Sequence, residues 1–137
     1  MERGGRIRRR VVANVAGDTL KAEIRRVVHP SAIIISDEHT AHWGLGKEFE
    51  GGRDHVSHGR REYVRGDVNT NTVESSFALV KRGLIGVYHN VSREHLHRYI
   101  DQYDFLWNTR TMNDGERTAL AIQSAEGKRL MYRQPAA

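Results

Sequence analysis

The chain has no cysteine, only two prolines and few aromatic side chains among its 137 residues. Without cysteine there are no disulfide bonds and no metal sites built on thiolate ligands. No apolar run reaches the length of a membrane-spanning helix, and the N-terminal residues lack the apolar stretch of a signal peptide. We therefore expect a soluble cytoplasmic protein with no membrane contact.

The chain is rich in basic side chains. Lysines and arginines number 22 against 17 aspartates and glutamates, which gives a net charge of +5. Such a balance favours an anionic partner, most often nucleic acid, although ribosomal and membrane-surface proteins share it. The length suits one domain with a modest core, and nothing in the sequence divides it into two.

The order of expected elements indicates an α/β fold with a mixed sheet. Paired glycines at positions 4 and 5 favour a tight turn, and a strand is expected over residues 6–15. The apolar, β-branched run 32–36 predicts a strand buried on both faces, and a short strand is expected near residues 55–58. Helices are expected from a cap at Asp18 to the stop at His29-Pro30, over 38–45, from about 71 through 84, from 92 to about 107, and over 114–126.

Residues 66–83 carry more chemical information than any other segment. Apolar residues at helical spacing predict a helix there with one buried stripe, made of Val73, Phe77, Val80 and Leu84. Glu74 and Lys81 are seven positions apart, about two turns, so they lie within roughly 20° of each other at the border of that stripe. A carboxylate and an ammonium aimed into the same half-buried space suit a metal ligand beside a phosphate-contacting group.

Asp37 directly follows the apolar run at 32–36, and catalytic carboxylates of open α/β sheets tend to lie at the carboxyl ends of strands. Each candidate has a structural alternative. Asp37 is equally suited to cap a following helix. Glu74 matches a capping box with Asn71, and Lys81 by itself is an ordinary solvated lysine. Together the three favour phosphodiester chemistry, because divalent cations used in such reactions are bound by carboxylates.

Other polar residues are less informative. The eight histidines are expected to be solvated or to contact phosphate rather than bind zinc, since His95 and His97 face different sides of a helix. The arginines at positions 6, 8, 9 and 10 populate both faces of the expected first strand. At least one of those faces must meet solvent or DNA.

Residues 66–83, 86–92 and 97–110 closely resemble the ISXO-like DDE transposases of bacterial insertion sequences. Residues 35–38 look like the surroundings of their second catalytic aspartate, and residues 127–133 are similar to their C-terminal ending. The resemblance implies an RNase H-like integrase core, a mixed sheet with flanking helices, and a metal-binding Asp, Asp and Glu. Asp37 would be the second of these and Glu74 the third, with Lys81 as the basic residue that follows the glutamate.

The first aspartate of that family has no counterpart in this sequence. The resemblance places it upstream of the turn at residues 2–5, so we expect residues 1–137 to be a partial catalytic domain, the C-terminal portion without its first two strands. Magnesium would then bind weakly. The edge of the strand at 32–36 would also be bare, which invites pairing with another chain and predicts marginal stability.

The expected function is DNA transposition, by metal-dependent strand cleavage and transfer when the domain is complete. Mg²⁺, or Mn²⁺, would be bound by Asp37 and Glu74, and Lys81 would contact phosphate. The expected partners are transposon ends, target DNA in the nucleoid, and a second copy or an intact transposase. The alternative is a non-catalytic DNA-binding or inhibitory remnant, and a weaker one is a nuclease for RNA–DNA hybrids.

Overall fold

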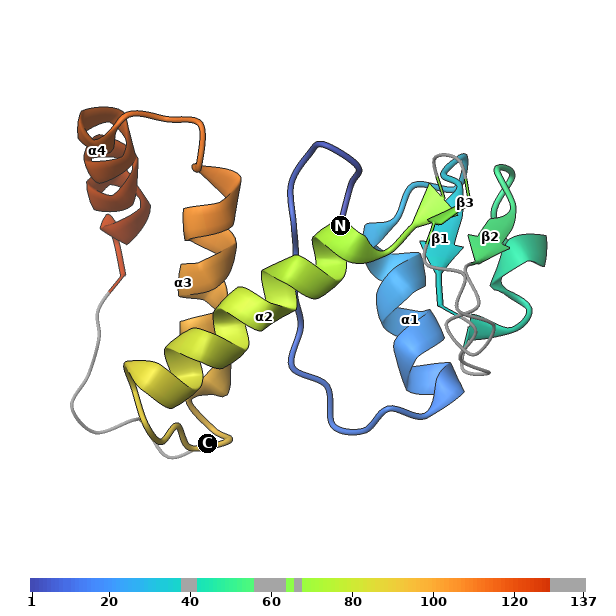
Figure 1. Cartoon of the computed structure of the whole chain (residues 1–137), viewed down its shortest axis with the longest axis horizontal. Helices are drawn as coiled ribbons and strands as arrows, with labels where there is room; N and C mark the ends of the chain where they lie inside the picture. Colours follow the sequence, from blue (N-terminus) through green and yellow to red (C-terminus); the bar gives the residue numbers. More distant parts are fainter. Residues whose placement is uncertain (38–41, 56–63, 66–67, 129–137) are drawn as a thin grey trace.

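The computed structural model describes residues 1–37, 42–55, 64–65 and 68–128, and leaves out the side chains of 64–65 and 68–69. It has a small α/β architecture, in which α2 runs diagonally between the sheet side of the molecule and the pair α3 and α4 (Figure 1). The elements are α1 (Gly17–Val27), β1 (Ile34–Ser36), the 3₁₀ helix η2 (Leu45–Lys47), β2 (Arg53–His55), β3 (Val64–Arg65), β4 (Val68–Asn69), α2 (Asn71–Gly86), α3 (Leu96–Asn108) and α4 (Asp114–Ala125). No helix of the described ranges is long and apolar enough to cross a membrane.

The sheets are short. β1 pairs in parallel with β2, with Ile34 opposite Arg53, and β3 pairs antiparallel with β4. β1 confirms the strand expected at 32–36, with a later start; of the short strand expected near residues 55–58, only His55 lies in the described residues, at the end of β2. The strand at 32–36 was predicted to be buried on both faces, which is wrong, because Ile34 and Ile35 are only half-buried and Ile33 is 62% exposed. Within the described ranges β1 has one strand partner, which leaves it less covered than a central strand.

The N-terminal segment is not the expected strand. The turn before it is formed as predicted, since the Gly5 N–H donates to the Glu2 carbonyl at 3.1 Å and Gly4 has φ of 66°. Residues 6–15 then form no strand, and the backbone groups of Ile7 and Arg9 bond to side chains of α3 and not to a neighbouring strand. In Figure 1 this segment passes between α3 and α1.

The start of α1 differs from the prediction. Asp18 was expected as the cap, but it lies in the first turn, and Ala16 occupies the N-cap position without a side-chain hydrogen bond. Asn14, two residues before the N-cap, fixes the chain entering the helix, since its side-chain oxygen accepts hydrogen bonds from the Ala16 N–H at 3.0 Å and the Thr19 hydroxyl at 2.8 Å.

The helix ends otherwise follow local signals. α1 stops at Val27, just before the predicted His29-Pro30 break. α3 begins at Leu96, four residues later than expected, and buries Ile100. α4 is confirmed, and a capping box between Asn113 and Glu116 starts it. Residues 38–41 of the helix expected over 38–45 lie outside the described residues, and its remaining part is not an α-helix, since η2 begins only at Leu45. Most of the ending at 127–133 also lies outside them.

α2 is confirmed, but its buried stripe is rotated, and of the four residues expected in it only Val80 is buried. The side that faces the rest of the fold carries Ser76, Val80 and Gly83, whereas Phe77 is 45% exposed. The Ser76 hydroxyl is satisfied by the Val73 carbonyl at 2.6 Å, so this small polar residue can be fully buried. Small residues at 76 and 83 let neighbouring segments approach α2 closely.

A surface ion pair joins α1 to the residue that follows η2. Arg25 donates from Nε and from its terminal nitrogen to the Glu48 carboxylate, at 2.6 and 2.9 Å. This hydrogen bonding lowers the pKa of Glu48 below its ordinary value, and burial opposes the shift only in part. Because the folded-state pKa is the lower one, the stabilisation is present above the unfolded-state value and is lost as the pH falls through the folded-state value.

We expect Glu48→Gln to reduce stability slightly near neutral pH and to make the loss of stability below about pH 4.3 shallower than in the wild type. The effect is small because exposed ion pairs are screened by solvent. Urea denaturation at neutral and acidic pH measures it, with the exposed Glu50→Gln as control. Parallel pH profiles for the wild type and Glu48→Gln would contradict the prediction.

Candidate functional site

Asp37 lies where the sequence predicts, immediately after the last residue of β1, and its side chain is 52% exposed. Its Oδ1 is 3.6 Å from Nε2 of His42. Arg53, from the neighbouring β2, holds the backbone around it: its Nε donates to the Ser36 hydroxyl at 2.8 Å and its terminal nitrogen to the Asp37 carbonyl at 2.7 Å. The end of β1 is thus positioned by a cross-strand arginine, while the helix-cap alternative for Asp37 falls on residues outside the described ranges.

Glu74 lies in the first turn of α2. The capping box that Glu74 matches with Asn71 is not formed, because the N-cap is Thr70 and its side chain makes no capping hydrogen bond. Instead the Thr70 hydroxyl donates to Oε1 of Glu74 at 2.7 Å. A carboxylate at this end of a helix is favoured by the helix dipole. β4, which leads into α2, lies against β1 and β2, so the helix starts beside the sheet that carries Asp37.

Lys81 follows two turns later on α2. Both Glu74 and Lys81 are exposed, so the half-buried space expected between them is not found. The shift of the buried stripe to Ser76, Val80 and Gly83 accounts for this, since it turns the border predicted from sequence toward solvent. An exposed ammonium on this face is accessible to an anionic ligand.

A three-ligand metal centre is not present among the described residues, and the two-carboxylate site of Asp37 and Glu74 stays a prediction. Nowhere in the described ranges do three His, Asp or Glu side chains come close enough together to hold a metal ion. The Asp37 carboxylate is instead close to a histidine ring, which repels a cation when it is protonated. Asp67, another acidic residue near α2 in sequence, lies outside the described residues. Asp37 and Glu74 therefore need at least one further acidic ligand before they match the three-carboxylate set that the resemblance implies.

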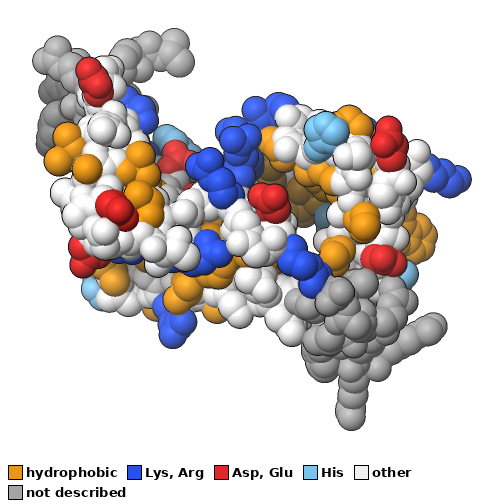
Figure 2. Space-filling view, turned by 90° about the horizontal axis from the view of Figure 1, so that it is seen from above, with side chains coloured by type: hydrophobic (Ala, Val, Ile, Leu, Met, Phe, Trp, Pro, Cys, Tyr) orange, Lys and Arg blue, Asp and Glu red, His pale blue; other side chains and the backbone are white. Residues whose placement is uncertain are grey.

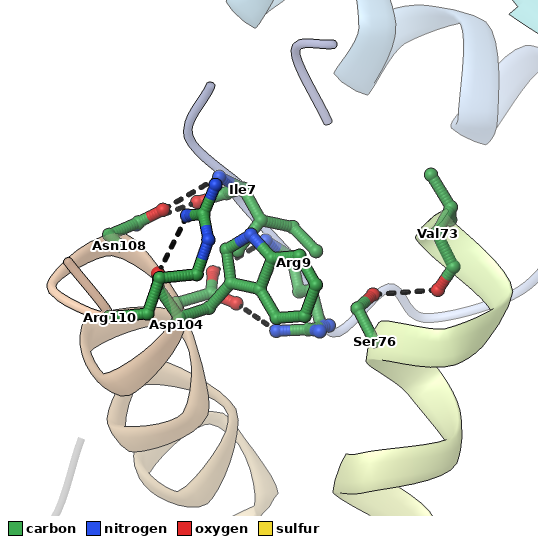
Figure 3. Close-up of polar contacts among 8 residues, drawn as sticks. Ile7, Arg9, Val73, Ser76, Asp104, Asn108 and Arg110 are labelled. Carbon is green, nitrogen blue, oxygen red and sulfur yellow. Dashed lines mark hydrogen bonds and ion pairs between the residues drawn. The ribbon is translucent and has the colours of Figure 1, made fainter. Parts of the chain in front are cut away.

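A buried ion pair between the N-terminal segment and α3 was not anticipated from the sequence. The Arg9 guanidinium pairs with the Asp104 carboxylate, and their side chains are only 5% and 13% exposed. The same carboxylate accepts the Arg9 backbone N–H at 2.7 Å, and the guanidinium lies over the Phe77 ring of α2 at 5.2 Å from its centroid. Figure 3 shows Arg9 extending from the segment between α3 and α2. Arg9 therefore links three parts of the fold and is not a surface arginine.

Two further contacts fasten the same segment to the C-terminal end of α3. The Asn108 side chain accepts the Ile7 N–H at 2.7 Å and donates to the Ile7 carbonyl at 2.9 Å (Figure 3). Arg110 lies over the Trp107 ring and reaches the Gly4 carbonyl at 3.4 Å. The only sequence signal for this attachment is the spacing of Asp104 and Asn108, which places two short polar side chains one turn apart on a helix otherwise rich in aromatics.

Basic side chains are concentrated in the N-terminal segment. Residues 3–10 contain five arginines, of which all but Arg9 are exposed. Figure 2 shows Lys and Arg side chains gathered over the middle of one face of the molecule. Elsewhere in the described ranges exposed acidic and basic side chains are interspersed, so the strongest local positive potential is expected along this segment.

Comparison with known proteins gives one match. Residues 1–108 match the model of a family described as the ISXO2-like transposase domain. The matched range contains Asp37, Glu74 and Lys81 together with the N-terminal segment and α1 to α3, while α4 lies beyond it. No curated protein and no solved structure matches the chain significantly.

Proposed function

We propose, from the premise that the chain belongs to the ISXO2-like transposase domain family, that it acts in DNA transposition and that its own contribution is to bind DNA. The family match carries this proposal. The net charge of +5 and the arginines of residues 3–10 support it, because basic side chains neutralise the negatively charged phosphates of DNA.

Binding to duplex DNA is the first test. We expect the protein to bind a fluorescent DNA duplex. The logarithm of the association constant should fall linearly with the logarithm of the salt concentration between about 50 and 200 mM. Fluorescence anisotropy measures this, with insertion-sequence terminal repeats and a scrambled duplex as probes. Tighter binding to the repeats at the same salt would indicate that the domain also reads sequence. No binding at the lowest salt would contradict the proposal.

Strand cleavage and transfer is the second candidate function. It is favoured by the position of Asp37 at the end of β1 and of Glu74 at the start of α2, beside the same sheet. We propose that these carboxylates belong to a magnesium or manganese site that also needs a further acidic ligand, and that Lys81 contacts DNA phosphate. An RNase H-like core remains part of this proposal.

Cleavage is expected when a further acidic ligand completes the site. The experiment combines the protein with a second chain that carries the family's first aspartate, and follows cleavage and joining of terminal-repeat DNA with and without Mg²⁺. Glu74→Gln and Asp37→Asn are each expected to abolish the activity of the mixture, whereas the exposed Glu94→Gln leaves it unchanged. Full activity with Glu74→Gln would overturn the ligand assignment.

Other results of the same experiment separate the alternatives. DNA binding without cleavage in any mixture, together with inhibition of an intact family transposase, would identify a non-catalytic member that joins the transposase assembly. Cleavage of an RNA–DNA hybrid in preference to duplex DNA would instead identify a nuclease. The two candidate functions are therefore distinguished by product analysis alone.

A further inference from the structure

We propose that Arg6, Arg8 and Arg10 form a preorganised row that contacts successive phosphates along one strand of DNA. We call these three residues the arginine row. The inference rests on the proposed DNA-binding function and names the part of the chain that carries it. It assigns the row to the sugar–phosphate backbone and predicts no reading of base sequence.

The first observation is that exposed and buried side chains alternate along residues 6–10. Arg6, Arg8 and Arg10 are exposed, whereas Ile7 and Arg9 between them are 5% and 8% exposed. A period of two is the pattern of extended backbone, in which successive side chains point to opposite sides. Exposed side chains two residues apart in extended backbone are spaced by about 6.6 Å. This spacing is comparable to that of successive phosphates on a strand.

The second observation explains what keeps the segment extended without a strand partner. Asn108 bonds both the N–H and the carbonyl of Ile7, at 2.7 and 2.9 Å, and Asp104 accepts the N–H of Arg9 at 2.7 Å. These two α3 residues are one helical turn apart, about 6 Å along the axis, which nearly equals the rise of two extended residues. One face of α3 therefore serves as the hydrogen-bonding partner of residues 7 and 9.

The buried arginine sets the direction of the row. Arg9 points inward to Asp104 and the Phe77 ring, so it is not available to a ligand, and its neighbours are turned to the opposite side. An anchored backbone lowers the conformational entropy that must be lost when the exposed arginines bind. Guanidinium groups suit this role, because they offer several donors in a planar fork that matches phosphate oxygens.

The experiment measures the salt dependence of binding to a duplex of fixed sequence and to a scrambled one. Each single substitution, Arg6→Ala, Arg8→Ala and Arg10→Ala, is expected to make the negative slope of log affinity against log salt shallower by about 0.9, equally for both sequences. The triple alanine variant should change the slope about three times as much. The triple lysine variant should keep the slope, since lysine retains the charge. Lys47→Ala, which removes an exposed charge from η2, is the control and should leave the slope unchanged.

Positioning by α3 is tested separately. Asn108→Ala leaves the charge unchanged, and we expect it to weaken DNA binding while the circular dichroism spectrum and the unfolding transition remain those of a folded protein. If Asn108→Ala does not fold, Arg8→Pro tests the extended conformation on which the row depends, because proline is compatible with extended backbone and leaves the bonds of residues 7 and 9 in place. It should then match Arg8→Ala in slope.

Each result has one meaning for the arginine row. An unchanged slope in the triple alanine variant overturns the row and leaves the proposed DNA-binding function in place. An equal loss with Lys47→Ala also overturns it, because binding would then reflect total charge. If the wild type fails to bind DNA at all, the proposed function and the row fail together, and binding to an acidic protein instead would assign the surface to a different partner.

Discussion

Replacing Asp104 by alanine is expected to lower the free energy of unfolding by about 3–5 kcal/mol, since a buried charge then loses its partner. The Arg9 side chain is 5% exposed and has its guanidinium between α3 and the Phe77 ring. It has no room to reach bulk water without detaching the N-terminal segment. The same substitution removes the acceptor for the Arg9 backbone N–H, which adds to the loss.

Urea denaturation followed by circular dichroism measures the change. Asp101→Ala is the matched control, because it lies one turn earlier on α3 and its side chain is exposed. We expect it to change stability by no more than about 0.5 kcal/mol. Asp104→Asn should fall between the two, since it retains an acceptor oxygen and loses only the charge. A loss under about 1 kcal/mol for Asp104→Ala would show that Arg9 finds another environment, and a variant without a folded baseline would agree with the prediction if the control folds.

Gly83→Ala is expected to destabilise the protein by about 1–3 kcal/mol, the usual cost of overpacking. A Cβ at position 83 would lie 1.3 Å from the Tyr103 hydroxyl oxygen and 2.4 Å from the adjacent ring carbon. The whole ring must therefore move, which disturbs the contact between α2 and α3. This loss outweighs the gain of up to about 1 kcal/mol that alanine normally brings to a helix interior.

The same helix offers a matched control for this prediction. Gly86 is the last residue of α2, and a Cβ there would meet nothing within 4 Å. We expect Gly86→Ala to be neutral or slightly stabilising. In a Tyr103→Ala background the cost of Gly83→Ala should shrink, which a double-mutant cycle measures as a coupling between the two sites. Equal effects of the two glycine substitutions would show that helix propensity, not close packing, decides the result.

For the candidate site, the positions of the acidic residues could be predicted from the sequence, but their exposure could not. Asp37 after β1 and Glu74 in the first turn of α2 could be placed from local signals, because a β-branched run and a helical period each specify where an element begins or ends. Their exposure could not be predicted. Val80 is buried as expected, but Ser76 and Gly83 share its face in place of Phe77, and only the neighbours of α2 decide which side is covered.

The α/β class, the family, the positions of α2 and α4 and the break after α1 could all be predicted from sequence, because they depend on residues close together in the chain. The hydrogen-bond partners of Ile7 and Arg9 depend instead on which helix packs beside the N-terminal segment. An extended, arginine-rich segment is compatible with a sheet, and α3 takes that place because Asp104 and Asn108 repeat at nearly the rise of two extended residues. Such a match joins residues about a hundred positions apart, which no local pattern reveals.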